Sequence, residues 1–174
     1  MTTLLSDRPT AEEYVEYYER YISLVPETDI VQASSAQLNE TLAFLRAIPP
    51  EKADYRYAPG KWSVKEVVGH LLDTERVFAY RTLSFARGNA APLPGYEQEE
   101  YVIAGEFDAY DMTDLISEYE QTRRGNLGFL RHLPATAWSR TGVASERSFT
   151  VRALAFVMVG HERYHLEVLR TRYL

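Results

Sequence analysis

The fold is read most directly from residues 63–75, SVKEVVGHLLDTE. Ser63 and Glu66 match a capping box, in which each side chain pairs with a backbone N–H group at the start of a helix. Apolar residues then recur with a helical period until about Arg87, where Gly88 ends the pattern. The stretch therefore predicts a long helix with one apolar face, which is typical of a helix bundle.

The rest of the chain also shows helical periods, and it has no sustained alternation of apolar and polar residues of the kind that forms a strand. The predicted helices span Thr10 to about Pro26, Asp29 to Pro49, Ser63 to Arg87, Gln98 to Ala104, Thr113 to His132, and Thr150 nearly to Leu174, with loops over 51–60 and 135–149. We therefore expect an all-α fold, an antiparallel four-helix bundle with additional short helices, in a single domain over residues 1–174.

Composition excludes several classes of protein. The 174 residues carry 19 Lys and Arg against 25 Asp and Glu, and this net charge of −6 argues against a nucleic-acid partner. The sequence has no run long enough for a membrane helix and no signal-peptide pattern at its start, so we expect a cytoplasmic protein without a membrane partner. The absence of cysteine excludes disulfides, thiolate metal ligands and a cysteine nucleophile.

Histidines are the main candidates for a functional site. His161 and His165 are four residues apart on the last predicted helix, on a stripe with apolar neighbours, so both rings should point inward and can converge on one ion. His70 lies at the edge of the apolar stripe of the helix that starts at Ser63. Together they would form a site of three imidazole nitrogens with open positions, which is typical of a catalytic metal site.

Other interpretations of these residues stay open. Core or surface histidines with ordinary hydrogen bonds are the alternative to a metal site. His132, at the predicted end of a helix, suits the helix dipole better than a metal. Residues 161–165 also match the zinc-protease pattern H-E-x-x-H, but no later histidine supplies the third ligand of that class, so we keep the two ligands and reject the protease. Glu162 is a candidate catalytic carboxylate that contacts a metal-bound water, or else a solvated helix carboxylate.

Four residues near His70 have less specific signals. Trp62 precedes the helix and can pack on it as a hydrophobic staple or form a pocket wall. Glu75 falls within the apolar stripe and needs a cation partner, either Arg81 or an arginine from another helix. Asp73 is a candidate to orient a ligand imidazole. Arg81 lies about 16 Å along the helix from His70, so it is too far to share an ion but can meet an acidic substrate tail.

Taken in order, the segments 60–75 and 160–166, with Arg81 between them, resemble the DinB superfamily, and in particular its DinB_2 and YfiT-like branch. The resemblance covers roughly residues 38–169. It implies an up-down-down-up four-helix bundle and maps the metal-binding histidines of the family onto His70, His161 and His165. It also implies a homodimer and a divalent metal ion, zinc or nickel first and manganese as a further candidate.

The same resemblance implies two alternative enzymatic functions. The first is transfer of a low-molecular-weight thiol of the bacillithiol or mycothiol type to a small electrophile, with the thiol supplied as a cosubstrate because the chain has no cysteine. The second is metal-dependent hydrolysis of a small-molecule substrate. Two non-catalytic alternatives also stay open: a bundle that binds a metal or small ligand without turnover, and a structural dimer whose histidines no longer have a function. We expect thiol transfer, with hydrolysis as the main alternative.

Overall fold

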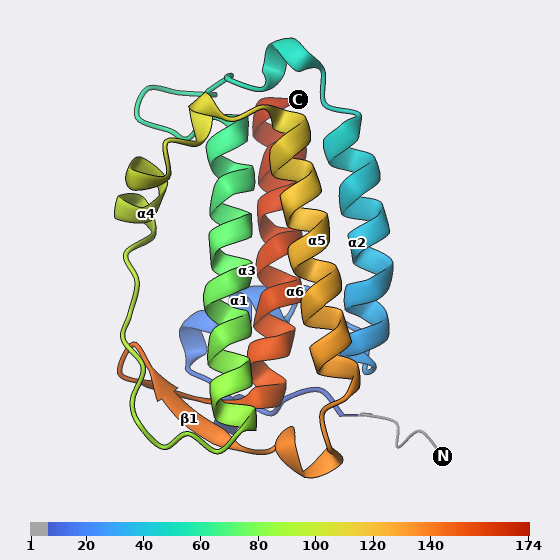
Figure 1. Ribbon diagram of the computed structural model, residues 1–174, viewed down its shortest axis with the longest axis vertical. Coiled ribbons are helices and arrows are strands. Elements are labelled where there is room, and N and C mark those ends of the chain that lie inside the picture. The colour runs from blue at the N-terminus through green and yellow to red at the C-terminus, as the bar shows by residue number, and fades with distance from the viewer. Residues whose placement is uncertain (1–6) are drawn as a thin grey trace.

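The computed structural model describes residues 7–174, so the first six residues, which belong to the start examined for a signal peptide, lie outside the description. Four long helices run along the long axis of the molecule (Figure 1). They are α2 (Ile30–Arg46), α3 (Val64–Ala86), α5 (Met112–Arg131) and α6 (Val151–Val168). Followed from blue to red in Figure 1, the chain goes up α2, down α3, down α5 and up α6. The predicted up-down-down-up bundle is confirmed.

The predicted helix starts are formed by side-chain caps. The side chain of Asp29 accepts hydrogen bonds from two backbone N–H groups of α2, and Thr150 caps α6 through the N–H of Ala153. Ser63 and Glu66 form the predicted capping box of α3. Arg87 and Gly88, the latter with a φ of 80°, end that helix as expected.

The four helices form a closed ring of neighbours. α3 packs on α5 and α6, and α2 packs on the other sides of the same two helices. Two large apolar clusters fill the ring. One gathers the C-terminal half of α3 and the N-terminal half of α6, and the other gathers the opposite halves of both helices. Buried polar side chains, including His70, Glu75, Arg123 and Glu162, belong to neither cluster. The apolar core is therefore interrupted by polar groups that need partners.

The predicted helix from Thr10 to Pro26 is wrong. This segment instead contains two 3-10 turns, η1 (Ala11–Glu13) and η2 (Glu16–Tyr18), and the single-turn helix α1 (Glu19–Ile22). The capping box at Thr10 does form, but the Glu13 side chain also binds Thr150 and Arg152 at the start of α6. The backbone is then extended at Tyr14. Tertiary contacts to α6 thus replace the helix that local propensity favours.

The predicted loop over 135–149 is also wrong in part. It contains a 3-10 turn, η5 (Ala135–Ala137), and an antiparallel hairpin of β1 (Thr141–Ala144) and β2 (Arg147–Thr150), seen at the lower end of Figure 1. The two residues between the strands, Ser145 and Glu146, have φ values of 52° and 61°. Tight hairpins need such positive φ values, and they are usually signalled by Asn-Gly, which is missing here.

Shorter elements complete the fold. The predicted short helix is confirmed as α4 (Gln98–Gly105), which lies on the flank of α3 outside the ring (Figure 1). The remaining turns are η3 (Pro50–Lys52), η4 (Phe107–Ala109) and the π-helical η6 (Leu169–Tyr173), which continues α6. None of the helices described is both long and apolar enough to cross a membrane.

Candidate metal centre

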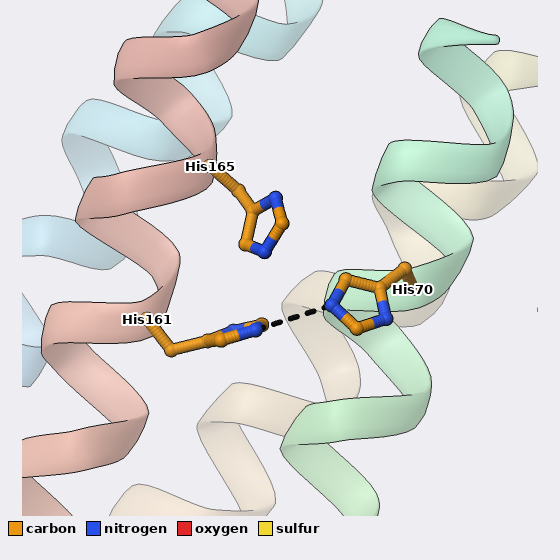
Figure 2. A group of neighbouring side chains, drawn as sticks. All are labelled: His70, His161 and His165. Carbon is orange, nitrogen blue, oxygen red and sulfur yellow. Dashed lines mark hydrogen bonds between the residues drawn. The ribbon is translucent and has the colours of Figure 1, made fainter. Parts of the chain in front are cut away.

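Three histidines from two helices meet inside the bundle. Figure 2 shows His161 and His165 projecting from α6 toward His70 on α3. The Nε2 atoms of His70 and His161 are 3.1 Å apart. One ring nitrogen from each of the three residues lies within 4.8 Å of the other two. The sequence prediction that these imidazoles converge on one point therefore agrees with the structure, and His132 lies outside the group.

Helix packing explains why they meet. His161 and His165 lie one turn apart on the same face of α6, and α6 packs against α3, so both rings face His70. On the other side, Gly160 lets α1 approach α6 closely, because a Cβ at Gly160 would overlap the carbonyl group of Tyr21. The Tyr21 ring consequently lies 5.2 Å from the His161 ring, measured between centroids.

Burial keeps all three imidazoles neutral near pH 7. It lowers the pKa of His70 to about 3, with a smaller contribution from His165, and it lowers the pKa of His165 to about 4. The pKa of His161 is held well below its usual value by burial and then by the two neighbouring imidazoles. A neutral imidazole keeps a nitrogen lone pair, so the cluster presents ligands rather than charges.

The donor set fits a divalent cation. Two nitrogens bound at about 2.1 Å to one tetrahedral ion lie roughly 3.4 Å apart, close to the 3.1 Å between His70 and His161. The widest separation within the group stays within 4.8 Å, so small side-chain rotations bring the third nitrogen to the same ion. Three imidazoles leave at least one coordination position open, and they suit zinc, nickel and related metals.

Thr74 and Trp62 surround His70. The Thr74 hydroxyl lies 3.4 Å from His70 Nδ1 and also contacts the Tyr96 hydroxyl, whereas Asp73 pairs with Arg76 on the surface of α3. Asp73 is one residue before Thr74, so its side chain is turned by about 100° from the direction of the Thr74 side chain. The prediction that Asp73 orients His70 is therefore wrong. The Trp62 ring lies 4.7 Å from the His70 ring and packs on the apolar core. It acts both as a staple and as a wall.

Glu162 faces a different set of partners from its neighbour His161. It is 1% exposed, and its carboxylate accepts hydrogen bonds from Gln37 and Thr41 of α2 and pairs with Arg123 of α5 at 2.9 Å. The alternative of a solvated carboxylate is wrong. The catalytic role of Glu162 stays a prediction, and these contacts favour a structural role instead.

Arg123 also pairs with Glu75 of α3, at 2.8 and 2.9 Å. This confirms that an arginine from another helix neutralises Glu75, and it assigns that role to Arg123 rather than Arg81. The sequence pattern does not indicate that Arg123 faces the core, because only the packing of α5 against the other helices places this face inward. His132 is also placed as expected, at the end of α5, where its Nδ1 lies 2.6 Å from the carbonyl oxygen of Gly128.

Within residues 7–174, two cavities of a size for small molecules border the histidine cluster, and a third, of about 10 Å³, only touches His161. The larger, about 470 Å³, has His161 in its wall, together with tyrosines from the N-terminal segment and Arg81 from α3. The smaller, about 240 Å³, has His165 and Trp62 in its wall. The segment around Gln98 borders both. The site is thus buried but open to small molecules at two different histidines.

The chain thus forms a four-helix bundle whose histidine cluster is accessible from two cavities that open to solvent. A family model for the DinB superfamily matches residues 34–169, and the chain belongs to this superfamily. Among solved structures, the fold is similar to YfiT from Bacillus subtilis, described as a probable metal-dependent hydrolase with an unusual four-helix bundle topology. The TM-score is 0.69 at 17% identity, over 95% of this chain and 93% of that one. The comparison with curated proteins found no match.

Proposed function

We propose that the protein is a divalent-metal enzyme whose ion is held by His70, His161 and His165. The observation that carries this proposal is the convergence of three neutral imidazoles at a point reached by two cavities. A purely structural site would be closed by a fourth protein ligand, whereas no other His, Cys, Asp or Glu in residues 7–174 joins the group. Zinc or nickel suits this donor set best.

The two cavities favour a reaction between two substrates. A bound divalent ion supplies Lewis acidity that lowers the pKa of a thiol or water. The chain itself holds the ligand nitrogens in place, shields them with Trp62 and Tyr21, and admits one molecule beside His161 and another beside His165. We infer transfer of a low-molecular-weight thiol to a small electrophile. The thiol loses its proton to solvent water, sulfur bonds to the electrophilic carbon, and the leaving group departs with its bonding electrons.

Metal-dependent hydrolysis is the second candidate, and the similarity to YfiT favours it. In that reaction a water molecule takes the place of the thiol, and a carbonyl or ester takes the place of the electrophile. Only one organic substrate is then needed, so the smaller cavity beside His165 would serve for access or product release.

An assay with and without thiol separates the two reactions. Protein purified without a histidine tag is loaded with zinc or nickel and given 1-chloro-2,4-dinitrobenzene with bacillithiol or mycothiol, or 4-nitrophenyl acetate with no thiol. Thiol transfer predicts dinitrophenyl thioether formation that requires the thiol and is lost in His161→Ala. Ester cleavage without thiol, lost in the same variant, would instead establish hydrolysis. Stoichiometric metal without either activity across a broad substrate screen would favour a binding protein.

A further inference from the structure

The larger cavity contains a buried positive charge that the metal chemistry does not use. Arg81 of α3 lines this cavity and is 3% exposed. Its Nη2 donates hydrogen bonds to the Pro94 carbonyl and the Ser145 hydroxyl, both at 3.0 Å. Within residues 7–174, no carboxylate lies within ion-pair distance of the Arg81 guanidinium, and no acceptor is hydrogen-bonded to its Nε or Nη1. The guanidinium therefore lacks a counter-charge within the described chain.

A second buried arginine, Arg123, provides an internal comparison. Arg123 is 1% exposed and pairs with two carboxylates, those of Glu75 and Glu162. Burial of an ion without a partner is costly, so buried charges in proteins are usually paired. Burial accordingly lowers the pKa of Arg81, whereas the carboxylates beside Arg123 hold its pKa above the usual value. Arg81 is thus built into the wall at an energetic cost that an anion in the cavity would offset.

Arg81 also stands in line with the histidine cluster. His70, Thr74, Phe78 and Arg81 follow one face of α3, since they are separated by four, four and three residues. The Phe78 ring lies between the two ends: its centroid is 5.5 Å from the Arg81 guanidinium carbon and 6.4 Å from the His161 ring centroid. An apolar strip therefore separates the guanidinium from the candidate metal ligands.

Aromatic rings share the remaining wall with the polar side chains of Thr74, Gln98 and Ser145, and the two charges at the rim are of opposite sign. Tyr18, Tyr21 and Tyr96 line the cavity with Phe78. At the rim, Arg147 and Glu97 are both exposed and carry opposite charges. Exposed charges interact weakly because water screens them. The buried guanidinium of Arg81 is therefore the dominant fixed charge inside the cavity.

We propose that this cavity binds an elongated organic carboxylate, with the carboxylate on Arg81, an apolar or aromatic body along Phe78 and the tyrosines, and the reacting end toward His161. The direction of the reacting end rests on the proposed function, whereas the carboxylate contact does not. The volume of about 470 Å³ suits a small organic molecule. A planar guanidinium with free N–H groups recognises a carboxylate through charge-assisted hydrogen bonds.

A pair of probes that differ only in charge tests the carboxylate contact. 4-Phenylbutyrate and its neutral amide, 4-phenylbutyramide, are titrated by NMR into metal-free protein, so the acid cannot bind through an ion. We expect the acid to bind about tenfold or more tightly than the amide, as a hydrogen-bonded charge pair typically gives. Equal affinities would overturn the proposal and leave Arg81 as a brace that holds Pro94 and Ser145 against α3. This comparison uses the unaltered protein, so it decides the question even if a variant fails to fold.

Variants then locate the contact. Arg81→Gln should abolish the preference for the acid, whereas Arg76→Gln, which removes an exposed arginine from the same helix, should keep it. Arg147→Gln should change the preference by less than about threefold, because water screens this rim charge. A preference that survives Arg81→Gln, or one lost in Arg147→Gln, would overturn the assignment. Zinc binding is measured separately, so loss of the metal site with an intact acid preference would refute only the proposed function.

Discussion

His161 and Glu162 show how much one residue along a helix decides. The first faces α3 and His70, and the second faces α2 and α5, where it meets Thr41 and Arg123. Rotation by about 100° per residue separates a candidate metal ligand from a buried ion pair. The zinc-protease pattern over residues 161–165 therefore contributes two imidazoles to one site and its glutamate to another.

Loss of one imidazole should empty the candidate metal site. His161→Ala removes one of three ligands, and we expect metal content to fall from about one ion per chain to near zero, since two imidazoles bind a divalent ion far more weakly than three. Elemental analysis of protein purified without a histidine tag measures this. His132→Ala is the matched control and should keep its metal. Equal metal content in the two variants would contradict the assignment.

The buried histidines should also make the metal-free protein sensitive to acid. The pKa of His70 is about 3 in the folded protein and about 6.5 in an unfolded chain, so between these values the unfolded state binds more protons. The free energy of unfolding should therefore fall as pH drops below 6.5, by up to about 1.4 kcal/mol per pH unit for His70.

Urea unfolding at pH 7, 6 and 5 with a chelator present measures this slope. Arginine partners lower the pKa values of the Glu13 and Glu27 carboxylates, so these groups become protonated only below the range of pH 5 to 7. The slope measured in this range therefore reports on the histidines. His70→Gln removes one titrating group and should give a shallower slope. An unchanged slope in that variant would show that His70 is not buried in its neutral form.

At the scale of elements, one ion-pair network links all four long helices. Arg123 of α5 contacts Glu75 of α3, Glu162 of α6 and Ser34 of α2. Each helix thus brings a polar group that only the other helices can satisfy. The need to satisfy these polar groups favours one register of the four helices. Burial of the apolar clusters stabilises the same arrangement.

Removal of the central cation should destabilise the bundle strongly. Arg123→Met leaves two buried carboxylates without a cation, and we expect the free energy of unfolding to fall by about 3–5 kcal/mol. Arg124→Met removes the next arginine, whose side chain is 58% exposed and pairs with Glu120 on the surface. Chemical denaturation of both variants makes the comparison, and the control should change little. Similar losses in both would contradict the buried network.

Two helix glycines should respond in opposite directions to the same substitution. In Gly160→Ala the new methyl group overlaps the Tyr21 carbonyl, so α1 must move away from α6, at a cost of about 1–3 kcal/mol. Gly125→Ala adds a methyl group where nothing lies within 4 Å, and it should stabilise α5 by about 0.5–1 kcal/mol. Thermal unfolding compares them. A harmless Gly160→Ala would mean that α1 does not pack tightly beside the histidines.

For the whole molecule, the topology decides where the site opens. The chain returns from the end of α3 to the start of α5 through α4, outside the ring (Figure 1). Gln98, at the start of α4, borders both cavities. The hairpin and the N-terminal turns complete the wall around Arg81 with Ser145, Arg147 and three tyrosines. Long connections thus form the walls, while the helices hold the candidate ligands.

A metal that binds the folded protein should raise its thermal stability. At a free concentration one hundred times its Kd, an ion stabilises the folded state by about 2.7 kcal/mol. For a chain of this length that corresponds to a rise in Tm of roughly 5–10 °C. Thermal unfolding with zinc or nickel, and again with a chelator, measures the shift. His161→Ala should show none, and a shift that persists in this variant would indicate binding elsewhere.

Local signals explain which predictions succeeded. Capping residues and helical periods predicted α2, α3, α4, α5 and α6 close to their observed bounds, because these signals act within one or two turns. The same logic failed for the N-terminal helix, where Glu13 binds α6, and for the hairpin, where Ser145 and Glu146 adopt positive φ without glycine or asparagine. In both segments distant contacts outweigh local preference.

Residue spacing alone predicts the helical class, the bundle and the inward direction of His70, His161 and His165, because a helix ties the direction of each side chain to its position along the chain. The tertiary structure alone decided that Arg123 neutralises both Glu75 and Glu162, that Arg81 is buried without a carboxylate, and that two cavities reach the histidines. Arg123 lies 48 positions from Glu75 and 39 from Glu162, so these partners are set by how the helices pack rather than by any local pattern.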